Sequence, residues 1–385
     1  MAREQTAPLR RGWTTGACAA AAARAAFAAL LTGRFPDPVT IRLPRGGVAS
    51  FVLALAECRE GRARAGIIKD AGDDPDVTHG ALIIAELAWA APGSGIRFRA
   101  GEGVGTVTRP GLPLAVGEPA INPAPRAMIR EALAEFAEAN GAASSGGMGP
   151  DVTVTIAIPG GERLAERTMN ARLGIVGGLS VLGTTGIVVP YSCASWIHAI
   201  HRGIDVARAA GLDHIAAATG ATSERAVQLL YDLPDHALID MGDFVGGTLK
   251  YLRRHPVARL TLAGGFAKLT KLAAGHLDLH SSRSRVDGAA LARLIAGLGA
   301  DPASIAAAES SDSAAEILAI AGGRGMALAE AVARQAREVV LATLSGFTLV
   351  EVAIVDRTGE FLALVGGPND NAVAACQVLR CQMAP

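Results

Sequence analysis

The most constraining feature of this sequence is an alternation of short apolar segments with amphipathic ones after residue 213. The pattern predicts, in chain order, a strand at 214–219, a helix at 223–231, a strand at 237–240, a helix at 244–253, a strand at 258–263 and a helix through Ala274. Short connections of this kind require right-handed crossovers, so we expect the strands to lie parallel in one doubly wound α/β sheet. Helices should follow over 288–344, and strands 349–356 and 360–365 should form a hairpin.

The first half of the chain mixes helices and strands without this regularity. We expect a helix of small residues at 17–31, strands at 39–43, 50–56 and 64–68, a helix at 77–90, a helix at 122–139 and a strand at 151–158. The domain boundary should fall between residues 159 and 172. The sequence therefore predicts a mixed α+β domain over residues 1–165 and an α/β domain over residues 166–385.

Composition excludes several classes of protein. Apolar residues make up 50% and charged residues 19% of the chain, which rules out intrinsic disorder as a general description. The 36 basic residues balance the 36 acidic ones, so the net charge predicts no nucleic-acid partner and no acidic membrane surface. The longest uncharged stretch, 173–201, is broken by glycines and by Pro190. It is therefore expected to form strands and a glycine-rich loop instead of a membrane span.

The cysteines favour a reducing cytoplasm. The chain has five, without a CxxC pair or metal-ligand spacing: Cys18, Cys58, Cys193, Cys376 and Cys381. We interpret Cys18 and Cys193 as packing residues. Arginines precede the N-terminal alanine run, but Arg24 interrupts it, so no signal peptide is predicted.

The densest polar segment is KDAGDDPDVTHG at residues 69–80. Its candidate catalytic residues are Asp70, Asp73, Asp74 and His79, which could bind a cation or a cationic ligand, or supply a general base. A solvated turn in which Asp76 caps the following helix explains the same residues. The spacing does not fit a calcium loop, because no glutamate closes it at the twelfth position.

Two further segments have both a functional and a structural interpretation. GEGVGT at 101–106, with Arg109 after it, could bring backbone N–H groups close to a ligand or could simply form a hairpin turn. No helix follows it, so it is not a dinucleotide fingerprint. RRGWTTG at 10–16 could form an anion cradle from Thr14, Thr15 and a helix N-terminus, or these hydroxyls could only cap the helix.

In the α/β half, glycines gather where strands are expected to end, which is where ligands bind in open α/β sheets. Asp240 follows Gly220 by twenty positions, a distance typical of an acidic residue that holds a ribose, although it could instead help cap the helix after Gly242. Lys268 and Lys271 should share one helical face, either as an anion-binding rim or as a solvated surface.

These segments together resemble one family. The resemblance rests on residues 11–20 (RGWTTGACAA), 70–80, 101–113, 117–123 (GEPAINP), 173–187 and 219–220, and it runs in order from about Leu9 to Asp287. The chain is similar to the CbiD family, the cobalt-precorrin-5B C(1)-methyltransferases of cobalamin biosynthesis. The resemblance implies an α+β domain followed by a Rossmann-like three-layer α/β domain.

The resemblance further implies transfer of a methyl group from S-adenosyl-L-methionine to carbon 1 of cobalt-precorrin-5B, giving cobalt-precorrin-6A. Cobalt would enter only as part of this corrinoid substrate, so no protein metal site is expected. We expect segment 70–79 to line a site between the domains. The residues assigned to the substrate are Arg11, Thr14, Thr15, Gly101, Glu102, Gly103, Gly105, Arg109 and Arg126, and those assigned to the methyl donor are Gly183, Thr184, Thr185, Gly220, Asp240 and Gly242.

Two rival functions fit the same residues. One is a metal-assisted phosphoryl-transfer or hydrolytic enzyme in which segment 70–79 binds a divalent metal. The other is a tetrapyrrole carrier without catalytic activity. A homo-oligomer is compatible with the sequence, and a general base is not required by it.

Overall fold

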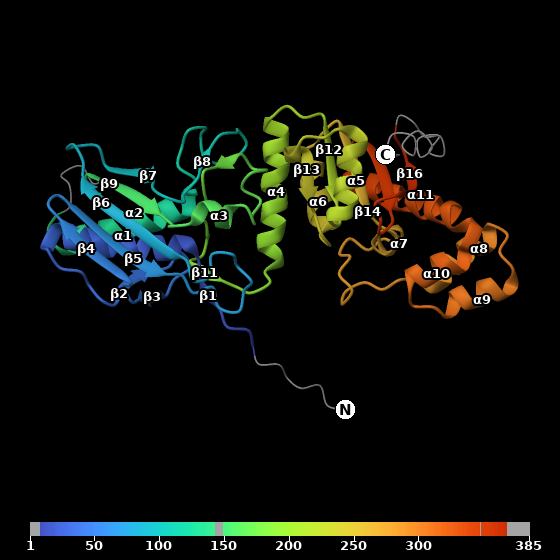
Figure 1. The fold of residues 1–385 in the computed structure, drawn as a ribbon, viewed down its shortest axis with the longest axis horizontal. Helices are drawn as coiled ribbons and strands as arrows, with labels where there is room; N and C mark the ends of the chain where they lie inside the picture. Colours follow the sequence, from blue (N-terminus) through green and yellow to red (C-terminus); the bar gives the residue numbers. More distant parts are fainter. Residues whose placement is uncertain (1–7, 143–148, 347, 368–385) are drawn as a thin grey trace. The chain divides into compact units, whose positions relative to one another are not determined.

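The computed structural model describes residues 8–142, 149–346 and 348–367, and it divides into two compact units, Met1–Cys193 (unit 1) and Ala194–Pro385 (unit 2) (Figure 1). The boundary lies later than the 159–172 segment predicted from the sequence. The reason is that residues 173–190 pair with unit 1: strand β10 joins β8, and β11 joins β1. Cys376 and Cys381 lie outside the described residues.

Unit 1 combines short strand pairs with one larger sheet. Its strands are β1 Gly12–Trp13, β2 Val39–Arg42, β3 Val48–Phe51, β4 Leu55–Arg59, β5 Arg62–Ile68, β6 Leu82–Trp89, β7 Ile96–Ala100, β8 Thr106–Val107, β9 Val152–Ala157, β10 Ile175–Val176 and β11 Ile187–Val188. Its helices are α1 Thr15–Thr32, α2 Pro123–Ala139 and α3 Gly161–Ala165. The larger sheet has the order β4-β5-β6-β9-β7, antiparallel except for the β7–β9 pair.

Helix α1 is the core of unit 1. Every residue from Thr15 to Ala29 is buried except Arg24, and most of them are alanines, so the helix packs at close range against α2 and against strands β5 and β6. By length and composition alone α1 could cross a membrane, but 78% of it lies inside the unit. Burial on all sides is expected of a core helix that has apolar residues around its whole circumference.

The helix predicted at 77–90 is wrong: the segment forms a turn and then strand β6. Strand β6 pairs with β5 on one side and with β9 on the other. Ile83, Ala85 and Leu87 are fully buried, with the period of two that a strand requires. The alanine, leucine and glutamate content favours a helix, but pairing with two neighbours outweighs this local preference.

Unit 2 matches the predicted alternation. Its helices are α4 Cys193–Ala209, α5 Ala221–Tyr231, α6 Val245–Arg254, α7 Phe266–Ala273, α8 Gly288–Gly297, α9 Pro302–Ser310, α10 Ala314–Ala321 and α11 Gly325–Leu344, with short 3-10 turns at Asp235–Ala237 and Gly322–Arg324. Its strands are β12 His214–Ala218, β13 Leu238–Asp240, β14 Arg259–Gly265, β15 Leu349–Val355 and β16 Phe361–Val365. The unit is mixed α/β, as expected.

The sheet of unit 2 has the order β13-β12-β14-β15-β16. All neighbouring strands are parallel except the terminal β15–β16 hairpin, which closes this sheet. Side chains on one face pack against α5, and those on the other pack against α4, α6, α7 and α11. Neighbouring strands β12 and β14 therefore continue into helices on opposite faces, which defines the switch point of the sheet.

A buried polar network crosses the sheet of unit 2 near the amino ends of its strands. The carboxylate of Glu351 is 1% exposed and accepts hydrogen bonds from Tyr231 Oη and Thr261 Oγ1, both at 2.7 Å, and from Arg259 at 3.3 Å. Since Thr261 donates to Glu351, it must accept from His214 Nε2, which lies 2.8 Å away. The network therefore requires a proton on Nε2 of His214.

We expect the stability of unit 2 to fall as the pH drops from about 6.5 toward 4. Burial, and next the guanidinium of Arg259, lower the pKa of His214 from its ordinary value of 6.5 to about 4. In this range His214 binds a proton in the unfolded chain but not in the folded chain, so acid favours unfolding. Above pH 6.5 His214 is neutral in both states, and the folded state is not destabilised in this way. Urea unfolding followed at several pH values should show a shallower dependence in His214→Gln. Equal slopes in wild type and variant would contradict this role.

Candidate functional site

Segment 70–80 is the loop of a β-hairpin. Strands β5 and β6 pair up to Ile68 and Leu82, and the neck of the loop is closed by two backbone hydrogen bonds. Lys69 N donates to Ala81 O at 2.9 Å, and Gly80 N donates to Lys69 O at 2.8 Å. The acidic side chains are thus presented from a closed loop at the end of the sheet, and not from the start of a helix.

The segment before α1 packs directly onto this loop. Arg11 forms an antiparallel bridge with Gly72, and Trp13 N donates to Asp70 O at 2.7 Å. A Cβ atom on Gly12 would stand 2.0 Å from the carbonyl carbon of Ala71, so only glycine permits this approach. Two segments about 60 residues apart in sequence, both singled out as candidates, therefore form one structure.

Arg10 binds two of the carboxylates of segment 70–79. Its guanidinium forms an ion pair with Asp70, and its backbone N–H donates to Asp73 Oδ2 at 2.6 Å. The hydrogen bond from Arg10, followed by that from Gly72 N, lowers the pKa of Asp70 to about 2. Asp70 is therefore ionised at neutral pH, which makes it a charge-bearing group and not a proton donor. Arg11 was predicted to bind the substrate, but Arg10 was not, because its only sequence signal is its place in the basic run before Trp13.

His79 lies beside Asp70 and keeps an exposed imidazole. Its Nδ1 accepts a hydrogen bond from Ala71 N at 3.1 Å and lies 3.8 Å from Asp70 Oδ1, and the side chain is 54% exposed. Because Nδ1 is used as an acceptor, the neutral ring carries its proton on Nε2. This arrangement gives the site a hydrogen-bond donor of fixed orientation.

An ion pair between buried Lys69 and Asp76 joins the neck of the loop to its interior. Lys69 is 1% exposed, and its ammonium group donates to Asp76 Oδ2. Asp76 also accepts from the N–H and hydroxyl of Thr78 at 2.7 and 2.6 Å. Burial would raise the pKa of Asp76, but Lys69 and Thr78 outweigh it and lower the pKa. Asp76 therefore holds the loop and does not cap a helix. Nearby Cys18 is fully buried, which raises the pKa of its thiol to about 12, as expected of a packing residue.

The glycine-rich segment 183–186 covers the start of α1. Thr14 N donates to Gly186 O and Gly16 N donates to Leu182 O, both at 3.0 Å, while Gly183 lies against the side chain of Thr14. Thr14 Oγ1 accepts from Ala17 N at 3.2 Å and so caps the helix. Thr14 and Thr15 are buried. Capping and these backbone bonds occupy the N–H groups of Gly16 and Ala17 that the anion-cradle hypothesis needed.

The side chain of Thr185 turns inward on its own segment, with Oγ1 3.1 Å from Ile187 O. Gly183, Thr184 and Thr185 thus lie beside the α1 N-terminus in unit 1, and the other residues assigned to the methyl donor lie in unit 2. The structure places Gly183 against Thr14, and the same chain segment reaches segment 70–79 through the bond from Tyr191 N to Asp74.

The GEGVG loop belongs to a second cluster in unit 1, where backbone packs on backbone. Gly103 N donates to Glu162 Oε1 at 2.8 Å, and a Cβ atom on Gly103 would stand 1.9 Å from Ile158 O. Gly105 N donates to Leu179 O at 2.9 Å, and Gly101 N donates to Ile156 O at 2.8 Å. Glu102 is exposed and uses its backbone carbonyl to accept from Ile158 N. Close packing within the protein accounts for these glycines.

Two of the three arginines assigned to substrate carboxylates have protein partners. Arg126 forms an ion pair with Glu118 at 2.6 Å, donates to the carbonyls of Ile121 and Pro119, and is 15% exposed. Arg109 lies 3.4 Å from the carbonyls of Ala171 and Arg172. Arg11 is exposed and uses its backbone in the bridge to Gly72. Of the three, Arg11 lies at the assembly formed by segment 70–79.

In unit 2, the predicted donor-binding residues lie at the carboxyl ends of the strands. Gly220 follows β12, and Asp240 ends β13 with its carbonyl accepting from Trp196 Nε1 at 3.3 Å. Gly242 lies beside the Trp196 ring. These residues share one end of the sheet, as the sequence predicts.

The two lysines of α7 form neither a solvated face nor an anion-binding rim. Lys268 Nζ donates to Thr219 O at 2.8 Å and pairs with Asp243 at 3.1 Å. Lys271 is buried and donates to Leu279 O at 2.9 Å. Lys268 therefore links the ends of β12 and β14 at the switch point. Sequence spacing could not reveal this, because the partners lie on other elements.

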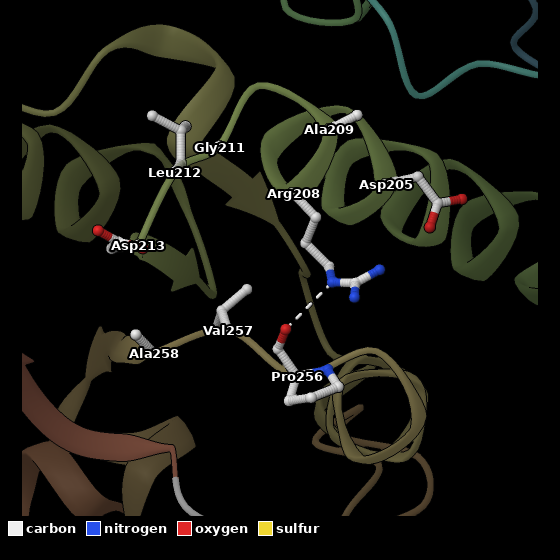
Figure 2. A pocket seen from close by; sticks show the side chains of 9 residues that line it. All are labelled: Asp205, Arg208, Ala209, Gly211, Leu212, Asp213, Pro256, Val257 and Ala258. Atoms are coloured by element: carbon white, nitrogen blue, oxygen red, sulfur yellow. Dashed lines mark hydrogen bonds between the residues drawn. The ribbon is translucent and has the colours of Figure 1, made fainter.

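A cavity of about 390 Å³ lies at the opposite end of the same sheet. It is lined by the end of α4 and by the loops before β12 and β14, and Figure 2 shows Arg208 Nε donating to Pro256 O, at 3.1 Å, across it. Ligands of parallel α/β sheets bind at the carboxyl ends. This cavity is at the amino ends and contains none of the predicted site residues.

The chain is similar to known proteins over nearly its whole length. A family model described as CbiD matches residues 2–190, and one described as the CbiD C-terminal domain matches residues 278–366. A cobalt-precorrin-5B C(1)-methyltransferase of Paramagnetospirillum magneticum is 58% identical over 94% of this chain and 99% of its own length. One from Bradyrhizobium sp. is 60% identical over 92% of this chain and 93% of its own. A crystal structure of a cobalamin biosynthesis protein (cbiD) from Archaeoglobus fulgidus is 28% identical, covers 71% of this chain and 83% of that one, and has a TM-score of 0.38.

Proposed function

The chain belongs to the CbiD family, and from this premise we propose that it transfers a methyl group to carbon 1 of cobalt-precorrin-5B, forming cobalt-precorrin-6A. The observation that carries this proposal is the extent of the likeness. Relatives named for this activity share more than half of their residues with this chain over nearly the full length of both. The two family models match segments in both units.

We infer that the methyl donor is S-adenosyl-L-methionine, which supplies a methyl group on a positively charged sulfur. As the new carbon–carbon bond forms, the methyl–sulfur bond breaks and its electron pair stays on sulfur, which becomes neutral. Such a transfer gains little from an oxyanion hole. The task of the protein is to align the reacting atoms and exclude water.

In unit 1 the proposed site is the assembly of segments 8–16, 70–79 and 182–191, called the loop assembly below. The loop assembly and the adjoining Lys69 contain four carboxylates from segment 70–79 and three cations, Arg10, Arg11 and Lys69, of which Arg10 and Lys69 form ion pairs with the carboxylates, so one negative charge remains in excess. This balance favours a sulfonium cation nearby. His79 Nε2–H and the exposed guanidinium of Arg11 are available to bind peripheral carboxylates of the corrinoid.

In unit 2 we propose that the adenosyl part binds at the switch point of a Rossmann-like sheet. Support comes from the strand order and from the helices on both faces. Gly220 and Gly242 would allow a close approach to the backbone, and Asp240, the last residue of β13, would accept a hydrogen bond from a ribose hydroxyl. Lys268 would fix the Thr219 carbonyl beside this position.

The rival hydrolytic hypothesis has no support. Among the described residues, no group of three or more histidine, cysteine, aspartate or glutamate side chains is arranged to hold a metal ion. Asp70 and Asp73 instead bind Arg10, and Asp74 binds a backbone N–H. A location in the cytoplasm remains a proposal, consistent with the unpaired state of Cys18, Cys58 and Cys193.

The test is methyl transfer by the purified protein. Incubation with cobalt-precorrin-5B and donor carrying a deuterated methyl group should give a tetrapyrrole with one labelled methyl group, detected by mass spectrometry. Asp73→Ala and His79→Ala should lower kcat/KM at least about tenfold, since each removes a charged or polar contact at the site. Glu60→Ala, at an exposed carboxylate in the β4–β5 turn, is the matched control. Binding of the substrate without labelled product would instead establish a carrier.

A further inference from the structure

Tyr191 has a backbone conformation that tyrosine rarely adopts. Its φ is +54°, and the only other non-glycine residues with positive φ in the described part of the chain are Asp232 and Ser345. In this left-handed region the Cβ atom crowds the backbone, and bulky residues are outliers there. Asp232 and Ser345 each end a helix, where this conformation is common. Tyr191 does not.

A hydrogen bond from a distant part of the chain holds Tyr191 in place. Its N–H donates to Asp74 Oδ1 at 2.8 Å, so a side chain of segment 70–79 fixes a backbone group 117 positions later. Pro190 precedes it, and strand β11, paired with β1, ends at Val188. The residue is therefore held through its own N–H and follows a paired strand and a proline, and its partner Asp74 is next in sequence to Asp73, which accepts from Arg10 N.

The ring of Tyr191 provides no compensation through burial, because the residue is 68% exposed. Three other large apolar residues of the loop assembly are about half exposed: Leu9, Leu182 and Val189. Burial of an aromatic ring would ordinarily offset an unfavourable backbone conformation. An exposed ring on a constrained, strained backbone instead indicates a residue that is positioned for contact with a ligand.

We propose that Tyr191 is a substrate-contacting residue whose ring stacks against the face of the tetrapyrrole, and that Asp74 is the positioning residue that sets the direction of this ring. The inference rests on the proposed function. A conjugated macrocycle offers a flat π face, and tyrosine provides apolar area with few rotatable bonds and a polar tip that remains in water. Leu9, Leu182 and Val189 would contact the remaining apolar edge. Asp74 then acts through its oxygen acceptor and moves no proton.

The experiment measures steady-state methyl transfer to cobalt-precorrin-5B in the full chain, with KM determined for both substrates. Tyr191→Gly should raise KM for the tetrapyrrole about tenfold, as loss of one stacked aromatic does for flat ligands, and leave KM for the donor unchanged. Its thermal unfolding midpoint should not fall, because glycine relieves the strain. Asp74→Ala should raise the same KM. The conservative variants Tyr191→Phe and Asp74→Asn should have a KM for the tetrapyrrole close to that of the wild type, since the first keeps the aromatic ring and the second keeps the oxygen acceptor.

Ser345→Gly is the matched control, because it removes a side chain at φ +52° in unit 2. It should leave both KM values at wild-type level. Two results would overturn the inference. The first is an unchanged KM for the tetrapyrrole in Tyr191→Gly, and the second is a KM raised as much in Asp74→Asn as in Asp74→Ala. The second result would show that the charge of Asp74 matters and not its acceptor. Wild-type protein that forms no labelled product would instead overturn the proposed function.

Discussion

Replacing Asp76 with alanine is expected to destabilise unit 1 by about 3 kcal/mol, because it leaves a buried ammonium group without its counter-charge. Lys69 is 1% exposed, and Asp76 is its ion-pair partner. Asp76 also accepts two hydrogen bonds from Thr78, so the turn of the loop would lose its anchor as well. Activity should fall with stability, because segment 70–79 is the part released.

Urea unfolding of the purified chain measures this effect, and a double-mutant cycle isolates its cause. Lys69→Met alone leaves a partly exposed carboxylate, which water can solvate, and should cost less than Asp76→Ala. The double variant Lys69→Met with Asp76→Ala should be more stable than Asp76→Ala alone, since the stranded charge is gone. If the two single effects simply add, the orphaned charge is not the cause.

Replacing Gly103 with alanine should cost at least about 3 kcal/mol and should not merely weaken ligand binding. The added methyl group would stand 1.9 Å from Ile158 O and 2.8 Å from Gly161 N, both backbone atoms that cannot move independently. The residue also has φ +70°, which disfavours any side chain. The prediction separates close internal packing from a ligand cradle as the reason for this glycine.

Gly61→Ala is the control for Gly103→Ala. Gly61 has φ +72°, but no atom lies within 4 Å of the position that its Cβ would take. The variant should therefore show the backbone cost alone, about 1 kcal/mol. Thermal or urea unfolding compares the two. Similar losses at both positions would mean that the contact with Ile158 relaxes freely, and the packing argument for the GEGVG loop would fail.

Most elements of unit 2 could be predicted because each strand or helix shows its own periodicity and is bounded by turn residues. Helix α4 was not predicted, because residues 173–201 were expected to form strands and a glycine-rich loop. The predicted strand at 214–219 corresponds to β12, and the predicted terminal hairpin corresponds to β15 and β16. The helix predicted at 77–90 was wrong for a physical reason. Its helix-forming residues belong to a strand that pairs with two neighbours, and only the tertiary structure shows this pairing. The domain boundary was predicted too early in the chain because strands of two residues, such as β11, have no periodic signal in the sequence.

The residues of the candidate site could be proposed from the sequence, but their arrangement could not. Residue type and local density singled out Asp70, Asp73, Asp74 and His79, and the family resemblance added their context. Nothing in the sequence shows that Arg10 pairs with Asp70, or that Asp74 holds Tyr191. These contacts join segments separated by 60 and 117 positions. A lone tyrosine after a proline gives no local signal, since its unusual φ exists only once the fold has formed.

The alanine content near the N-terminus, which by itself suggests nothing more than a bias in codon usage, has a geometrical role. Because α1 is enclosed by its neighbours along most of its length, the width of its side chains sets how near the sheet and α2 can approach its axis. Segments 70–72 and 182–186 contact the chain just before α1 and at its first turn. The small alanine side chains thus set the spacing of the segments that form the proposed site.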